Sequence, residues 1–481
     1  MDKRDLIGKI LFVLSIIGFI YMFITPITNI LIHVDEYWTL SLINLPLIEG
    51  MKVAINDVHP PLYYLMLYPI LGILKMANVG NMIYALKIVS IIPYFAILCL
   101  SYFKLKDEYN WLTAGLFAFA IVVMGDFFIQ FLTLRMYSWG LLFLLLSFVY
   151  YREVLTKNDR RSWMLLTLFT LLSAYTHYFL ILTSGLIYIL LLIHIIRNNL
   201  KVKQWIYSVI SLAILYLPWL LVLLRQLNTQ NHTTYPGSMG AVDIFNYLIF
   251  YSIKSTDLTV GWLAIKILAL AFVVLIVFMI FKKKTDDEGL FELSGIFLFY
   301  GTIAIGVIIL AISFKPLQAR YLVPVSAIFW LAASIVIGKI ENSKILAVLL
   351  VCVLVLSAGS VFLTSSDITD RISDDSQRSA FLDSINNNDT VVVYNTNFGY
   401  MFVHDDLNNT LEYSLSDTYF FDEKVKISKD INMIIKKNPD KDIYLVNWDG
   451  ASKNKLKFDG KVSQTESYNS GDVIFLKLDK K

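Results

Sequence analysis

The sequence predicts a polytopic α-helical membrane protein with a small C-terminal α/β domain. Of its 481 residues, 57% are hydrophobic and only 16% are charged, against roughly 45–50% and about 25% in soluble proteins. The charges are also unevenly distributed. Residues 365–481 carry 15 Lys and Arg against 20 Asp and Glu, whereas the residues before them carry 26 against 18. We therefore predict a membrane domain over 1–364 and a water-soluble domain over 365–481.

Net charge and cysteine content exclude several classes of function. The formal net charge is only +3, and nucleic-acid binding proteins are typically strongly basic, so we expect no nucleic-acid partner. Cys99 and Cys352 lie far apart in apolar stretches. Their spacing predicts neither a disulfide framework nor a zinc site.

Eleven apolar segments are candidates for spans, since a crossing takes about 20 residues. They are 9–32, 84–103, 111–131, 134–151, 163–177, 178–197, 205–224, 259–281, 290–314, 320–338 and 345–364. Lys and Arg collect in cytoplasmic loops. The Lys and Arg residues at 3–9, 152–161, 197–203, 282–284 and 339–344 therefore predict a multi-pass protein of the cell membrane with a cytoplasmic N-terminus and an extracytoplasmic C-terminal domain. Working back from these anchors also places Lys104 and Lys106 on the inner side.

Segment 61–79 is also apolar, but its crossing would move the basic loop 152–163 to the outer side. We therefore expect 61–79 to lie along the outer interface as an amphipathic helix, within a first outer loop that covers 33–83. The alternative is that 61–79 crosses and that 246–258, or another short segment, restores the parity. The protein would then have 12 or 13 spans by this count.

The C-terminal region reads as an α/β domain. Short β-type runs at 390–395, 442–447 and 472–478 alternate with helix-like stretches near 376–387 and 428–438. The region contains no Gly-rich phosphate loop and no cluster with metal-ligand spacing. We favour an accessory or stabilising role for it over substrate recognition.

The first outer loop carries acidic residues and a histidine that need an explanation. Asp35 and Glu36 follow the first span directly, and carboxylates near lipid are costly unless they face water or a cavity. A carboxylate there suits a general base for an acceptor hydroxyl or a ligand of a divalent cation; the alternative is a solvated loop charge. Asp57 and His59 follow in the same loop, directly before two prolines.

Further polar residues fall at predicted outer turns, namely Arg135, His177, Arg320 and Tyr321. A lone arginine between spans usually extends toward the headgroups. A guanidinium also matches phosphate oxygens in pairs. Two arginines, two histidines and three carboxylates on one face together predict a site for an anionic lipid with an acid/base group.

These motifs resemble a known family. Asp35-Glu36, followed by Asp57-Val58-His59-Pro60-Pro61-Leu62, resembles the DE and HPP motifs of the protein O-mannosyltransferases and of the wider GT-C superfamily, which includes the aminoarabinose transferase-like family. The LRMY run around Arg135 and the THYF and ARYLVP runs are similar to other segments of such enzymes. The resemblance covers about 1–340.

The resemblance implies an enzyme that transfers a hexose or pentose from a polyprenyl-phosphate donor, with inversion, to an extracytoplasmic lipid, glycan or protein acceptor. It implies that Asp35 is the general base or orients the acceptor, supported by Glu36. The residues implied to bind the donor are Asp57, His59, Arg135, Tyr137, His177, Arg320 and Tyr321, with Arg135 and Arg320 on the lipid phosphate. It implies no metal or other cofactor, and an interfacial helix after HPP. Tyr63-Tyr64 replace a lysine of the mannosyltransferases, which leaves the acceptor open.

Two other functions stay open at this point. A lipid-linked sugar flippase or transporter would typically show repeated halves and ionisable residues in mid-span, and the sequence shows neither. A polymerase or ligase of lipid-linked oligosaccharides would also use outer arginines. The pairing of DE with HPP in the first outer loop favours the transferase over both.

Overall fold

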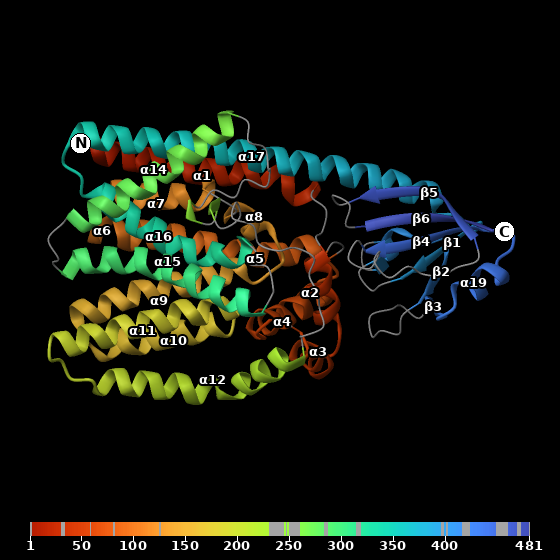
Figure 1. Cartoon of the computed structure of the whole chain (residues 1–481), viewed down its shortest axis with the longest axis horizontal. Helices are drawn as coiled ribbons and strands as arrows, with labels where there is room; N and C mark the ends of the chain where they lie inside the picture. Colours follow the sequence, from red (N-terminus) through yellow and green to blue (C-terminus); the bar gives the residue numbers. More distant parts are fainter. Residues whose placement is uncertain are drawn as a thin grey trace. The chain divides into compact units, whose positions relative to one another are not determined.

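The computed structural model describes residues 2–29, 34–57, 59–79, 82–124, 127–229, 245–246, 248–249, 260–282, 287–313, 319–395, 399–400, 403–415, 424–448, 460–468 and 473–480. It divides into two compact units. The first comprises Met1–Ile27 and Leu45–Thr364, and the second comprises Thr28–Asn44 and Ser365–Lys481. The first unit is helical, and the second contains a six-stranded sheet, drawn in blue in Figure 1.

The helices of the first unit follow the predicted spans closely. They are α1 (Lys3–Asn29), α3 (Leu47–Ile55), α4 (Leu62–Met76), α5 (Met82–Leu100), the π-helical turn η1 (Ser101–Leu105), α6 (Lys106–Glu108), α7 (Trp111–Val123), α8 (Phe127–Leu132), α9 (Tyr137–Lys157), α10 (Arg160–Ala174), α11 (Tyr178–Arg197), α12 (Lys203–Thr229), α14 (Val260–Lys282), α15 (Asp287–Ser313), α16 (Ala319–Gly338) and the first part of α17 (Ser343–Ile385).

Among the described residues, 8 helices are long and apolar enough to cross a membrane. They are the continuous helix Ile83–Glu108, together with α9, α11, α12, α14, α15, α16 and α17. Each coincides with a predicted span, which confirms a multi-pass membrane protein. The count of eleven spans stays a prediction, as does the orientation of the termini.

One predicted span is not a single helix. Segment 111–131 is divided because α7 ends at Val123, Met124 adopts an extended backbone, and α8 begins at Phe127. The prediction of one span treated 111–131 as a single apolar run, although Gly125 and Asp126 interrupt it in the sequence.

The length of α4 bears on the ambiguous segment 61–79. Its 15 residues extend about 22 Å at 1.5 Å per residue, which is shorter than a hydrocarbon core of about 30 Å. The length is compatible with an interfacial helix, and that placement stays a prediction. In the alternative, most of segment 246–258 lies outside the described residues.

Burial distinguishes central helices of the first unit from peripheral ones. In α16, 89% of the most apolar stretch is buried, against 11% in α12. The exposed side chains of α12 include Ile210, Ile214 and Leu221. Since apolar surface of this extent is stable only away from water, α12 presents a face suited to lipid, and α16 forms the core.

Basic residues predicted for separate inner loops meet at one end of this unit. The ammonium group of Lys104 binds the carboxylates of both Glu108 and Glu153. The guanidinium of Arg152 and the ammonium of Lys339 lie 4.8 and 5.8 Å from the ring centre of Tyr109. The three loops therefore share one end, as the charge pattern predicts.

The second unit confirms the predicted α/β domain. Its strands are β1 (Thr390–Tyr394), β2 (Leu411–Ser414), β3 (Lys426–Ile427), β4 (Asp442–Trp448), β5 (Gly460–Tyr468) and β6 (Val473–Lys480), in the sheet order β3-β2-β1-β4-β6-β5. The first four strands in that order are parallel, and β6 and β5 continue the sheet in antiparallel fashion.

Two apolar clusters cover the two faces of this sheet. Alternate strand residues point to opposite faces, so Val391 packs with Ile434 of α19 (Ile431–Lys437), while Val392 packs with Leu382 from the end of α17. Every residue of β1 is buried. Its unbroken apolar run is typical of a parallel strand that is covered on both sides.

A segment from near the N-terminus belongs to the second unit. Helix α2 (Val34–Asn44) presents Tyr37 and Trp38, and both pack against the cluster that contains Leu382 and Phe475. The acidic residues predicted for catalysis therefore lie on a helix that shares its apolar core with the C-terminal domain.

Candidate functional site

The predicted site residues of the first unit all lie near helix ends. They are Asp57 and His59 before α4, Arg135 before α9, Tyr137 as the first residue of α9, His177 as the N-cap of α11, and Arg320 and Tyr321 in the first turn of α16. Tyr137 begins the helix that ends at Lys157, within the basic end of the unit. The site residues and the basic cluster therefore occupy opposite ends of the same helices.

The HPP segment is anchored to a neighbouring turn. Pro61 is the N-cap of α4 and has a φ of −85°, close to the value that the proline ring imposes. The N–H of the next residue, Leu62, donates to the carbonyl of Tyr175 at 3.1 Å. This bond joins the start of α4 to the turn that carries His177, so two distant loops are held together.

Asp57, His59 and Arg135 form a chain of hydrogen bonds. Nδ1 of His59 lies 3.2 Å from Oδ2 of Asp57, and Nε2 of His59 lies 3.1 Å from Nη2 of Arg135. Nη2 of Arg135 also lies 3.4 Å from Nδ1 of His59. His59 therefore lies between the Asp57 carboxylate and the Arg135 guanidinium and orients that guanidinium.

Tyr64 is a member of this chain that sequence reasoning did not assign. Its hydroxyl donates to Oδ2 of Asp57 at 3.2 Å, and the residue is 1% exposed. The sequence signal for this role was the position of Tyr64 directly after the HPPL run and Tyr63, in the first turn of α4. From the sequence alone, Tyr64 was considered only as a departure from the lysine of the mannosyltransferases.

His177 lies among the other site residues. It is 4% exposed, and its ring centre lies 6.3 Å from that of His59, 5.5 Å from that of Tyr137 and 5.2 Å from that of Tyr321. Its Nδ1 accepts the N–H of Phe179, so the hydrogen of the neutral ring lies on Nε2. His177 therefore caps α11 and presents a donor inside the cluster.

The electrostatics of this cluster favour a neutral His177. Burial lowers the pKa of His177 well below its usual value, and the neighbouring His59, Arg135 and Arg320 lower that pKa further. The influence of Arg320 also places its guanidinium near the imidazole, in agreement with the 5.2 Å separation of the Tyr321 and His177 rings.

The cluster formed by Asp57, His59, Arg135, His177 and Arg320 brings two guanidinium groups together. Arg135 is 2% exposed, and an arginine stays charged even when buried. The arrangement suits an anion, since charge-assisted bonds from arginine to phosphate are among the strong polar contacts in proteins.

A buried glutamine supports this site from α12. Nε2 of Gln226 donates to the carbonyls of Ala54 and Ile55, at 3.3 and 3.0 Å, and its Oε1 accepts the hydroxyl of Tyr178. These bonds tie the end of α3, directly before Asp57, to two other helices. The sequence signal for this contact was a glutamine at the end of an apolar helix, because polar side chains often join helices in membranes.

Asp35 and Glu36 are described with the second unit. Glu36 is 2% exposed, Asp35 is partly buried, and the Thr39 hydroxyl donates to the Asp35 carbonyl at 3.0 Å. The other seven of the nine predicted site residues lie in the first unit. The histidine that precedes α2 in the sequence, His33, lies outside the described residues.

Within the described part of the chain, no three His, Cys, Asp or Glu side chains are grouped in a way that would hold a metal ion. Asp57 with His59, and Asp35 with Glu36, are groups of only two such side chains.

Comparisons with known proteins bear on the fold. No protein-family model matches the sequence, and a search of curated proteins finds no match. Among solved structures, apo ArnT from Cupriavidus metallidurans superposes with a TM-score of 0.52 at 10% identity, over 87% of each chain. ArnT from the same organism bound to undecaprenyl phosphate superposes with a TM-score of 0.55 at 11% identity, over 97% of each chain. The chain therefore has the fold of these two ArnT structures.

Proposed function

We propose that this protein is a membrane glycosyltransferase that moves a sugar from a polyprenyl-phosphate donor to an extracytoplasmic acceptor. One observation carries the proposal: the buried Arg135 is hydrogen-bonded to His59, and Arg135 and Arg320 both act on the charge of the buried His177. The likeness in fold to an ArnT structure with bound undecaprenyl phosphate supports a phosphate-bearing lipid as the occupant.

The reaction is a single displacement. The acceptor hydroxyl oxygen bonds to the anomeric carbon while the bond from that carbon to the phosphate oxygen breaks, so the configuration inverts. The base takes the hydroxyl proton, and the bonding electrons leave with the lipid phosphate. Donors aimed at the developing charge lower the barrier. Arg135 and Arg320 suit that role, and Nε2–H of His177 adds a neutral donor.

We assign the base to Asp35, with Glu36 in support. The assignment rests on the resemblance of the DE motif and on chemistry, since a carboxylate is a competent acceptor of a hydroxyl proton. Glu36 is buried on α2, which suits it to hold the helix and its neighbour in place. Asp57 is less suited to be the base, because its carboxylate already accepts from His59 and Tyr64.

The test is donor turnover by purified protein. The protein is incubated with a panel of polyprenyl-phosphate hexoses and pentoses, with and without extracts that contain acceptors, and release of free polyprenyl phosphate is measured. We expect one donor class to be consumed. Movement of intact donor across proteoliposomes without cleavage would instead indicate a flippase.

Asp35→Ala tests the assignment of the base. We expect this variant to insert and to bind polyprenyl phosphate as the wild type does, and to lose transfer. Asp159→Asn, at the opposite end of the helices, is the matched control and keeps full transfer. Normal turnover by Asp35→Ala would remove Asp35 from the mechanism.

A further inference from the structure

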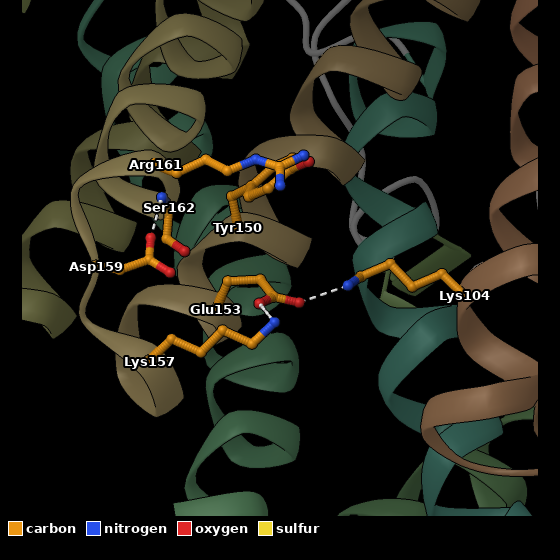
Figure 2. Close-up of a pocket in the computed structure, with 7 residues that line it drawn as sticks. All are labelled: Lys104, Tyr150, Glu153, Lys157, Asp159, Arg161 and Ser162. Atoms are coloured by element: carbon orange, nitrogen blue, oxygen red, sulfur yellow. Dashed lines mark hydrogen bonds and ion pairs between the residues drawn. The ribbon is translucent and has the colours of Figure 1, made fainter.

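A polar cavity lies at the basic end of the first unit, away from the site described above. Its volume is about 220 Å³, below the roughly 300–1,000 Å³ of sites that enclose whole small molecules. It is lined by charged and hydroxyl side chains from η1, from the end of α9 and from the start of α10 (Figure 2). Its size suits a headgroup rather than a complete ligand.

The two carboxylates of this cavity are already engaged. Glu153 binds the ammonium groups of both Lys104 and Lys157, shown by the dashed lines in Figure 2. Asp159 caps α10, since its Oδ1 accepts the N–H of Ser162 at 2.7 Å. That bond holds the pKa of Asp159 below its usual value. Neither carboxylate therefore needs a further cation.

Arg161 is the cation of the cavity that these carboxylates do not neutralise. It lies in the first turn of α10 and makes no ion pair within the part of the chain that the structure describes. In Figure 2 its side chain extends toward Tyr150. The Tyr150 ring is stacked on Phe169, with ring centres 5.6 Å apart. A guanidinium and a hydroxyl thus line the cavity as donors for an anion.

The same face of α10 continues as an apolar stripe. Met164 and Leu168 follow Arg161 at spacings of three and seven residues, and they are 61% and 45% exposed. Residues at these spacings share one face of a helix. A molecule with its phosphate at Arg161 would therefore have its apolar part along Met164 and Leu168, which is the shape of a membrane lipid.

We propose that this cavity binds the phosphate headgroup of an anionic glycerophospholipid, with Arg161 as the principal phosphate ligand and Tyr150 as a second donor. On the topology that the charge pattern predicts, the lipid belongs to the cytoplasmic leaflet, and basic pockets between membrane helices on that side bind such headgroups. The inference does not depend on the proposed transferase function.

The test compares two neighbouring arginines. Wild type, Arg161→Gln and Arg160→Gln are purified in a neutral detergent and titrated with short-chain phosphatidylglycerol, with phosphatidylcholine and with inorganic phosphate. Binding is followed by native mass spectrometry and by the thermal midpoint. Both variants lose one charge from adjacent exposed positions, but only Arg161 lines the cavity, so a general electrostatic effect would be the same in both.

We expect Arg161→Gln to weaken phosphatidylglycerol binding about tenfold, as for loss of one charge-assisted bond, and Arg160→Gln to leave it unchanged. Tyr150→Phe keeps the stacking on Phe169 and should weaken binding by a smaller factor. Equal effects of the two arginine variants would overturn the proposal. Saturation by inorganic phosphate at the same concentrations, or equal binding of phosphatidylcholine, would overturn the assignment to an anionic lipid.

Discussion

The two ends of the helical unit use charge in opposite ways. At the basic end, carboxylates and cations alternate, so Glu153 lies between Lys104 and Lys157, and Glu108 accepts from Arg152. At the other end, the guanidinium groups of Arg135 and Arg320 act on His177, and burial keeps that imidazole neutral. The comparison teaches that paired charges such as those of Glu153 stabilise helix ends, whereas guanidinium groups gathered around a neutral imidazole suit an anionic ligand.

The strongest way to break this comparison is to remove the buried guanidinium of the site. We expect Arg135→Ala to lower donor turnover about 10²–10³-fold, as for loss of a donor that stabilises a leaving group. Turnover by purified enzyme measures it. Arg135→Lys keeps the charge but loses the planar guanidinium group. Its turnover should lie between those of wild type and Arg135→Ala. Arg160→Gln, at the other end, is the control. Full turnover by Arg135→Ala, in a correctly folded preparation, would show that the cluster is not a phosphate site.

Asp57→Asn tests whether the carboxylate orients His59. An asparagine keeps the size of the side chain but removes the negative charge that faces His59 at 3.2 Å. We expect turnover about 10–100-fold below wild type, the equivalent of one charge-assisted bond. Tyr64→Phe removes a neutral bond to the same carboxylate and should have a smaller effect. If Asp57→Asn matched wild type, the hydrogen-bond chain would have no part in the reaction.

Glu153→Gln tests the basic end. The substitution leaves Lys104 and Lys157 without their shared carboxylate. We expect the free energy of unfolding to fall by about 1–3 kcal/mol, a range that allows for the exposure of Lys157. Turnover per folded molecule should not change. Thermal midpoints and turnover on the same preparation measure both quantities, and a loss of turnover at unchanged stability would contradict the assignment of this network to stability alone.

His177→Asn gives the smallest effect and bears on pH. The folded-state pKa of His177 is depressed, so protonation favours the unfolded state. The stability contribution of the neutral ring is therefore complete above the unfolded pKa of about 6.5 and is lost as the pH falls below it. Asparagine keeps an N-cap acceptor for Phe179 and does not titrate. We expect the thermal midpoint of the variant to fall less than that of wild type between pH 7.5 and 5.5; parallel curves would contradict the depressed pKa.

The sequence predicted which residues of the first unit lie on one side because successive spans run in opposite directions. Every second loop therefore lies at the same end of the helices. Once basic loops such as 152–161 defined one side, Arg135, His177 and Arg320 had to lie on the other. The contacts of Gln226 and Tyr64 were not predictable in this way, since a polar residue in an apolar helix shows that a partner exists but not which one. The break after Val123 was missed because 111–131 was treated as one apolar run, although Gly125 and Asp126 interrupt it.

The placement of α2 depended on still more distant information. Its Tyr37 and Trp38 pack in a cluster with Leu382 and Phe475, and no local pattern connects those segments. Amphipathic spacing tells which face of a helix is buried, but the identity of the covering surface comes from the whole fold.

That placement has a consequence for how the protein is made. Helix α2 is synthesised early, yet the apolar surface that receives Tyr37 and Trp38 is completed only by Phe475 of the last strand. Contacts so distant in sequence form late in folding. A ribosome can therefore finish and insert every span while the helix with Asp35 and Glu36 still lacks its packing partner. Any activity that uses these carboxylates would begin only after β6 has been made and has packed into this cluster.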